Sequence, residues 1–236
     1  MFTTAHAPSD TILRGWQATR TRLAMAAALL DVARRVYDSP LRALEALRGL
    51  RAEERAMLPE GRRLRLHRGR VYSRPAGPGF PSRAWERAVE VELNRALRYR
   101  PGFDLPIALL AVTRHCALHC AHCSEWNPLQ QPDTLSVDAL RAVADALRGR
   151  GVSHLELTGG EPLQRLDAVE AIARDAADTC DVWVLTSGAP MTEHNARRLA
   201  DAGVTAKDIG AAFFANLLDM ILRGDGTHQL LGILRL

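Results

Sequence analysis

The chain has 236 residues, 47% of them hydrophobic, and a formal net charge of +4. This length is enough for one or two domains with cores of their own, and the composition is ordinary for a globular protein. No apolar run reaches the roughly 18 residues that a membrane-spanning helix needs, and no signal peptide is visible, so we expect a cytoplasmic protein with no membrane partner.

The N-terminal part, residues 1–101, is predicted to be a basic and mostly helical domain. It carries 20 Arg against 10 Asp or Glu, whereas residues 102–236 carry 11 Lys or Arg against 17 acids. A basic half of this kind can bind nucleic acid or an acidic peptide. Because no base-reading motif or aromatic platform accompanies the charge, we interpret it as solvated helix faces and expect no nucleic-acid partner.

Helix caps and turn residues divide this domain into its elements. Ser39 caps a helix that has Pro40 at its first position, and Ser82 caps a later helix. Weak alternation around Arg68 and Gly69 indicates a hairpin, and a linker rich in Pro and Gly follows it. The prediction is therefore helices over residues 11–37, 40–50 and 82–98, a hairpin over 63–73 and a linker over 75–81.

From residue 105 onward, predicted strands alternate with predicted helices. Ser136 caps the first of these helices and Gly151 closes it. This alternation implies right-handed crossovers and a parallel sheet, with the active site at the carboxyl ends of the strands. The predicted strands are residues 105–112, 153–158 and 181–185, and the predicted helices are residues 137–150, 166–177 and 192–202.

The cysteine loop, residues 116–123, follows the first of these strands. It holds three of the four cysteines, Cys116, Cys120 and Cys123, in the spacing C-x3-C-x2-C. Three thiolates on one tight loop can hold three irons of a [4Fe–4S] cluster. The fourth iron is then left without a protein ligand and can take a small molecule, which makes the cluster a reaction site.

Three other interpretations of the cysteine loop need weighing. Structural zinc needs four ligands, so His119 or His122 would have to complete the set within the same eight residues. A ferredoxin-type cluster needs a fourth cysteine, and the candidate is Cys180, whose context indicates burial beside a strand start. A disulfide is disfavoured because no export signal is visible, which indicates a reducing cytoplasm.

The GGEP turn, residues 159–162, ends the second strand of this half. Gly159 and Gly160 let the backbone come close to a ligand, and the carboxylate of Glu161, before Pro162, can accept hydrogen bonds from an ammonium group. The turn begins 36 residues after Cys123, one predicted helix later. At this point the sequence resembles the radical S-adenosylmethionine (radical SAM) superfamily, over residues 106–203, and the two motifs together are specific.

The resemblance implies a [4Fe–4S] cluster on Cys116, Cys120 and Cys123, with S-adenosylmethionine chelated by the open iron. An external one-electron reductant would reduce the cluster, which would cleave the cofactor. The resulting 5′-deoxyadenosyl radical would abstract hydrogen from a substrate, either a small molecule or a peptide. The protein would contribute placement and exclusion of water.

The resemblance also implies which residues hold S-adenosylmethionine. The GGEP turn would hold the amino end of its methionine part. His122 stands just before the third cysteine, where the family often has an aromatic residue near the adenine. Thr186 stands where the third strand of the family meets the cofactor. This chain reads Thr-Ser-Gly there, whereas relatives often read Thr-Asn-Gly.

The chain departs from the family pattern after residue 203. Family members commonly continue with a fourth strand that carries Ser-Leu-Asp, but residues 205–210 read Thr-Ala-Lys-Asp-Ile-Gly. We therefore predict an α/β fold with a partial (β/α) barrel of about three strand–helix units over residues 102–203, preceded by the helical domain and followed by an atypical tail, 204–236. The tail indicates either a shortened but folded variant, or one completed by a partner, or else a truncated or fused reading frame with a foreign tail, and the truncated or fused frame is favoured.

Two functions are compatible with these observations. The favoured one is a radical SAM enzyme, or a fragment of one, that cleaves S-adenosylmethionine to abstract hydrogen from a substrate that the sequence does not identify. The alternative is a catalytically incomplete fragment or interaction module that binds a cluster or zinc. Iron content and release of 5′-deoxyadenosine distinguish the two.

Overall fold

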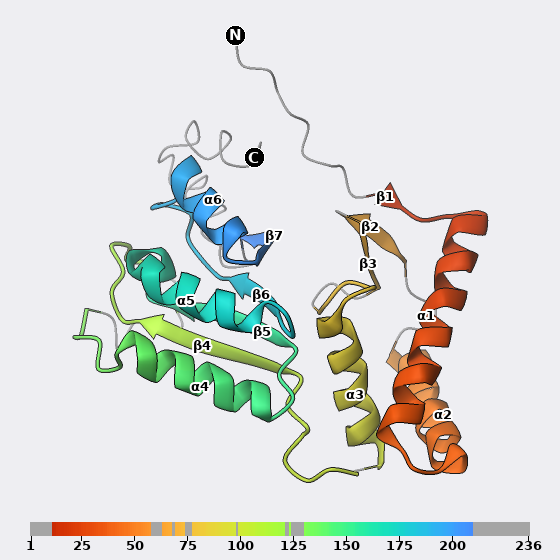
Figure 1. Cartoon of the computed structure of the whole chain (residues 1–236). Coiled ribbons are helices and arrows are strands. Elements are labelled where there is room, and N and C mark those ends of the chain that lie inside the picture. The colour runs from red at the N-terminus through yellow and green to blue at the C-terminus, as the bar shows by residue number, and fades with distance from the viewer. Residues whose placement is uncertain are drawn as a thin grey trace.

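The computed structural model describes residues 11–57, 63–67, 69–73, 77–97, 99–120, 123 and 130–209. This part of the chain forms a helical N-terminal region and a parallel sheet flanked by helices (Figure 1). None of the helices described is both long and apolar enough to cross a membrane.

Three helices of the N-terminal region pack around a core of their own. Val32 and Ala33 of the first helix and Trp85 and Leu93 of the third are buried in it. The hairpin prediction is confirmed, because two antiparallel strands flank Gly69, which has a φ of 76°. The elements are β1 (Thr11–Ile12), α1 (Gly15–Val36), α2 (Pro40–Met57), β2 (Arg65–His67), β3 (Arg70–Tyr72) and α3 (Arg83–Leu97), and the small sheet has the order β1-β2-β3.

The second half of the fold is a parallel sheet in which strands alternate with helices, as predicted. Ser136 and Thr192 cap two of the helices, each accepting a hydrogen bond from a backbone N–H three residues later. The elements are β4 (Ile107–Thr113), α4 (Val137–Gly149), β5 (His154–Gly159), the 3-10 helix η1 (Pro162–Arg165), α5 (Leu166–Ala176), β6 (Asp181–Val184), α6 (Glu193–Asp201) and β7 (Val204–Ile209), with the strand order β4-β5-β6-β7.

The strand β7 is an addition to the three predicted strands. It pairs in parallel with β6, with Val204 opposite Val182, and the hydroxyl of Thr205 donates to Asp181 (2.5 Å). Backbone pairing at the edge of a sheet does not require the continuous apolar run by which buried parallel strands are recognised. Within the described residues the sheet is open, with β4 and β7 at its edges.

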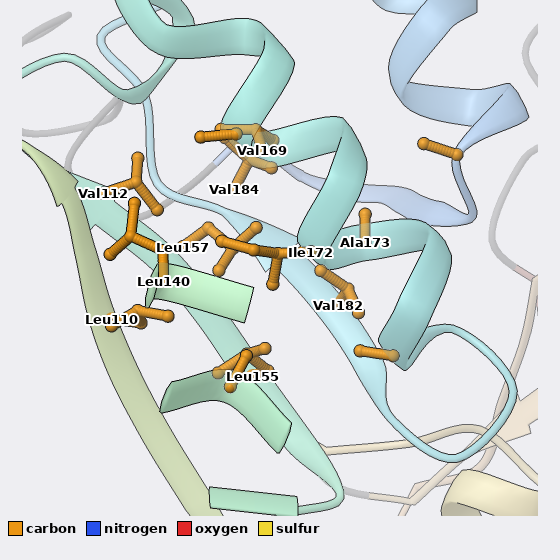
Figure 2. Packing of buried hydrophobic residues seen from close by; sticks show 14 of the residues in the cluster. Leu110, Val112, Leu140, Leu155, Leu157, Val169, Ile172, Ala173, Val182 and Val184 are labelled. Atoms are coloured by element: carbon orange, nitrogen blue, oxygen red, sulfur yellow. The ribbon is translucent and has the colours of Figure 1, made fainter. Parts of the chain in front are cut away.

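The main core lies between the sheet and the helices α4 and α5. Figure 2 shows Leu110, Leu155 and Leu157 from the strands beside Leu140 and Ile172 from the helices. Side chains on β4 alternate in burial, since a strand turns successive residues to opposite faces. The uncovered face of β4 exposes 41% of Ile107 and 62% of Leu109.

The helical region contacts the sheet at the amino ends of its strands. Arg87 of α3 donates to the carbonyl oxygen of Val152 (3.3 Å), just before β5, and to that of Arg148 in the last turn of α4. Gly151 lies so close to α3 that a Cβ there would stand 2.7 Å from Val91. The arrowhead of β4 points away from α3 (Figure 1), so the carboxyl end of the sheet is left clear of this contact.

One ion pair between α5 and α6 makes stability depend on pH. Arg198 donates two hydrogen bonds of 2.7 Å to the buried Glu170, and these hold the pKa of Glu170 below its ordinary value. A carboxylate with a lowered pKa in the folded state stabilises the fold above its unfolded pKa of about 4.3, and this contribution is lost as pH falls through the folded pKa. We expect Glu170→Gln to lower the melting temperature by about 2–4 °C at pH 7 and by progressively less below pH 4, as followed by circular dichroism.

The matched control is Glu193→Gln, which removes an exposed ion pair with Arg197. It should change the melting temperature little at either pH, because exposed pairs contribute little. An equal effect of Glu170→Gln at pH 7 and pH 3 would contradict the assignment to this ion pair.

Candidate cofactor site

The predicted site residues follow three neighbouring strands and lie at the carboxyl end of the sheet. The cysteine loop follows β4, the GGEP turn ends β5, and Thr186 follows β6. Because parallel strands end on the same side of a sheet, all three segments lie at this carboxyl end. His122 lies outside the described residues, as does the segment between Cys123 and Gln130.

The described part of the cysteine loop presents three thiols in a compact turn, and none of them is in a disulfide. Cys116 is buried, whereas Cys120 and Cys123 are half-buried. The N–H of Cys123 donates to the carbonyl oxygen of Cys120 (3.2 Å), and the N–H of Leu118 donates to the sulfur of Cys116 (3.4 Å). No group of three or more His, Cys, Asp or Glu in the described residues is drawn together closely enough to hold a metal ion. The loop therefore supplies three thiols that can ligate a metal, but in the described residues they do not point to one common centre.

The donor chemistry of the loop fits an iron–sulfur cluster. Thiolates are the usual ligands of such clusters, and three of them leave one iron open. Zinc needs a fourth ligand, and His119, the described histidine of the loop, is exposed. Cys180 cannot complete a ferredoxin-type set, because it is buried just before β6 and donates to the carbonyl oxygen of Val152 (3.1 Å) at the opposite end of the sheet.

The thiol of Cys116 has a pKa above its ordinary value. Burial raises its pKa, the N–H of Leu118 acts in the opposite direction, and the negative charges of Glu161 and Cys123 raise it further. Since a thiol must lose its proton to bind a metal, metal binding has to displace this proton. The GGEP turn lies near this cysteine, since the N–H of Glu161 donates to the carbonyl oxygen of His115, the preceding residue.

The two glycines of the GGEP turn press against the backbone that leads into the cysteine loop. A Cβ on Gly159 would stand 2.3 Å from the carbonyl oxygen of Thr113, and one on Gly160 would stand 2.3 Å from that of His115. The N–H of Gly160 donates to Thr113 (2.8 Å) and that of Glu161 donates to His115 (2.7 Å). The sequence predicts that these glycines leave room for a ligand, and the structure places the backbone of Thr113 and His115 against them.

The carboxylate of Glu161 points inward and is surrounded by hydrogen-bond donors. Glu161 is only 2% exposed. One oxygen accepts from the N–H of Leu163 (3.0 Å) and the hydroxyl of Thr186 (2.5 Å). The other accepts from the N–H (2.9 Å) and the hydroxyl (2.5 Å) of Ser187. Pro162 is buried and begins η1, and the structure brings Thr186 to the carboxylate of Glu161, the residue before it.

Two residues beyond the cysteine loop support its base, and neither was predicted from the sequence. The carboxylate of Asp133 accepts from the hydroxyl of Thr113 (3.0 and 3.1 Å) and the N–H of Arg114 (2.8 Å). Burial acts to raise the pKa of Asp133, but these hydrogen bonds outweigh it and the pKa lies below its ordinary value. Gln130 donates from its backbone to Arg114 (2.9 Å) and from its side chain to the carbonyl oxygen of Cys116. No motif marks either residue.

A surface groove of about 470 Å³ lies elsewhere, between α4 and α5. Arg141 and Arg148 line it and form ion pairs with the nearby Asp138, Asp145 and Asp175. Neither the cysteines nor the GGEP turn contribute to it, so we assign the groove to helix packing and not to the site.

A family model and several known proteins match this part of the chain. The model of the Radical SAM superfamily matches residues 110–236. The chain is 35% identical to a GTP 3′,8-cyclase of Erythrobacter litoralis over 100 residues, which are 40% of this chain and 30% of that protein. It is 39% identical to a PqqA peptide cyclase of Rhizobium meliloti over 113 residues, which are 45% of this chain and 29% of that protein.

A longer match, at 33% identity over 143 residues, is to a GTP 3′,8-cyclase of Ectopseudomonas mendocina, and it covers 54% of this chain and 42% of that protein. The chain thus spans less than half the length of each of these relatives. No solved structure matches the chain significantly.

Proposed function

The chain belongs to the radical SAM superfamily, and from this premise we propose that Cys116, Cys120 and Cys123 hold a [4Fe–4S] cluster beside a site for S-adenosylmethionine. The observation that carries the proposal is the hydrogen bond of 2.7 Å from Glu161 to His115, the residue before Cys116. It keeps the GGEP turn against the base of the cysteine loop. A cofactor held by the turn would therefore lie within reach of an iron held by the loop.

The residues of the chain divide into those that hold the cluster and those that hold S-adenosylmethionine. The three thiolates bind irons, and the backbone of the GGEP turn holds the methionine part of the cofactor, with Thr186 beside it, because protein donors already fill the carboxylate of Glu161. His122 is proposed to lie near the adenine. The bound cluster supplies one-electron reductive cleavage of S-adenosylmethionine, which yields 5′-deoxyadenosine once hydrogen has been taken from the substrate. An external reductant provides the electron, and a reducing compartment such as the cytoplasm suits this chemistry.

We favour a peptide as the substrate. One group of relatives is named for a peptide and another for GTP. In this chain, α1 exposes Trp16, Leu23 and Leu30 at intervals of seven residues, by 73%, 65% and 39%. Arg20 and Arg34 are exposed on the same helix. An apolar stripe with Arg beside it matches a peptide that carries both apolar and acidic residues.

Anaerobic reconstitution with iron and sulfide tests the proposal. We expect a brown protein with about four irons per chain, which releases 5′-deoxyadenosine when dithionite and S-adenosylmethionine are added. Iron without this product would support a cluster-binding fragment that does not turn over. Zinc in place of iron would support the binding-module alternative.

The same assay separates the two substrate classes. A pool of synthetic amphipathic acidic peptides should raise the release of 5′-deoxyadenosine above the rate without substrate, whereas GTP should not. Stimulation by GTP alone would contradict the peptide proposal and leave the cluster assignment intact.

A further inference from the structure

We propose that Ser187 is a positioning residue that holds the carboxylate of Glu161 and thereby keeps Cys116 in place for the cluster. The link from Ser187 to Cys116 is a property of the iron-free chain. Its consequence for S-adenosylmethionine rests on the proposed function. Ser187 is the middle residue of the Thr-Ser-Gly segment, in which the resemblance assigned a role to Thr186 alone.

Ser187 donates more hydrogen bonds to the carboxylate of Glu161 than Thr186 or Leu163 does. Ser187 donates twice to the same carboxylate oxygen, from its N–H (2.9 Å) and from its hydroxyl (2.5 Å). Thr186 and Leu163 each donate once to the other oxygen. A carboxylate offers about four acceptor positions, so these four donors occupy all of them.

The position of the buried Glu161 carboxylate depends on each of its hydrogen-bond donors. In the described residues, Glu161 forms no ion pair with an Arg, a Lys or a His, and the polar contacts of its carboxylate come from neutral N–H and O–H groups. Removing one donor leaves a buried charge with an unfilled acceptor position, which is costly because water cannot replace the lost partner. The hydroxyl of Ser187 is therefore expected to matter more than an exposed serine hydroxyl would.

The backbone of Glu161 connects its held carboxylate to the cysteine loop. The N–H of Glu161 donates to the carbonyl oxygen of His115 (2.7 Å), and His115 precedes Cys116 in the chain. Gly160 adds a parallel hydrogen bond to Thr113 (2.8 Å). If Glu161 shifts, both contacts weaken, and the buried thiol of Cys116 becomes accessible.

Thiol alkylation of the iron-free protein tests the coupling without any cofactor. We expect iodoacetamide to modify Cys116 about tenfold faster in Ser187→Ala than in wild type, because loss of one hydrogen bond to a charged group is of this size. The rate at Cys180 should not change. Ser187→Thr keeps the hydroxyl and should restore the wild-type rate. Peptide mass spectrometry assigns the modified cysteine.

Cys180 and Ser153 provide the controls. Cys180 is buried at the opposite end of the sheet, so a faster reaction there would show global destabilisation and would overturn the proposal. Ser153→Ala removes a hydroxyl that donates to Pro106 (3.2 Å), also at that end, and should leave the rate at Cys116 within about twofold of wild type. An unchanged rate at Cys116 in Ser187→Ala would equally overturn the proposal.

A second measurement on the iron-loaded protein addresses S-adenosylmethionine. In wild type, the cofactor should change the electron paramagnetic resonance spectrum of the reduced cluster, and Ser187→Ala should need about tenfold more cofactor for the same change. If wild type shows no change, the proposed function fails, while the alkylation result still decides the role of Ser187. If wild type and Ser187→Ala respond at the same concentration, Ser187 does not position the site.

Discussion

Replacing Cys116, Cys120 or Cys123 with alanine is expected to reduce the iron retained after anaerobic reconstitution from about four atoms per chain to nearly none. Each thiolate would hold one iron, so each substitution leaves two irons without a protein ligand. Release of 5′-deoxyadenosine should fall below detection in all three variants. Iron and sulfide content, visible absorption and product chromatography measure the effect.

Two further substitutions act as controls for the cysteine variants. Cys180→Ala should retain the iron, because Cys180 is buried at the other end of the sheet beside Val152. His119→Ala should also retain it, since His119 is an exposed residue of the loop. Loss of iron from Cys180→Ala would favour a cluster with four cysteines, and loss of metal from His119→Ala would favour the zinc alternative.

Replacing Gly159 with alanine is expected to destabilise the fold by roughly 3–5 kcal/mol. Its φ of 135° is rarely adopted by residues with a side chain, and a Cβ would stand 2.3 Å from the carbonyl oxygen of Thr113. The atom in the way belongs to the backbone, so no side chain can move aside. The ends of β4 and β5 must then separate. Urea unfolding of the iron-free protein measures the loss of stability.

The matched control is Gly49→Ala within α2, where nothing lies within 4 Å of the added carbon. It should stabilise the protein by about 0.5–1 kcal/mol, because alanine is the better helix former. Unfolding of both glycine variants at the same urea concentration would contradict close packing at Gly159. Retention of iron by Gly159→Ala would further show that the spacing of β4 and β5 does not matter for the cysteine loop.

Local sequence patterns were sufficient to predict most elements of this fold. Capping residues such as Ser136 and Thr192 act within one turn of the chain, so they are readable without knowledge of the fold. The predicted helix of residues 137–150 is observed as Val137–Gly149, and the predicted strand of residues 181–185 as Asp181–Val184. Strand β7 was missed because its pairing depends on the exposed edge of β6, which no local pattern records.

The motifs of the candidate site were also readable, but the reasons for some of their residues were not. The spacing of Cys116, Cys120 and Cys123 is a local property of eight residues, and its pairing with the GGEP turn pointed to the family that the comparison shows. The glycines of that turn were explained by a ligand, while the structure places the backbone of Thr113 and His115 against them.

The sequence by itself determined the order of the elements, the chemistry of the three thiols and the family. Only the tertiary structure decided that Glu161 meets Ser187, 26 residues later in the chain. It also decided that the GGEP turn lies against the residue before Cys116. The physical reason is that helix periods and caps depend on near neighbours in the chain, whereas contacts between strand ends depend on the register and close packing of the whole sheet.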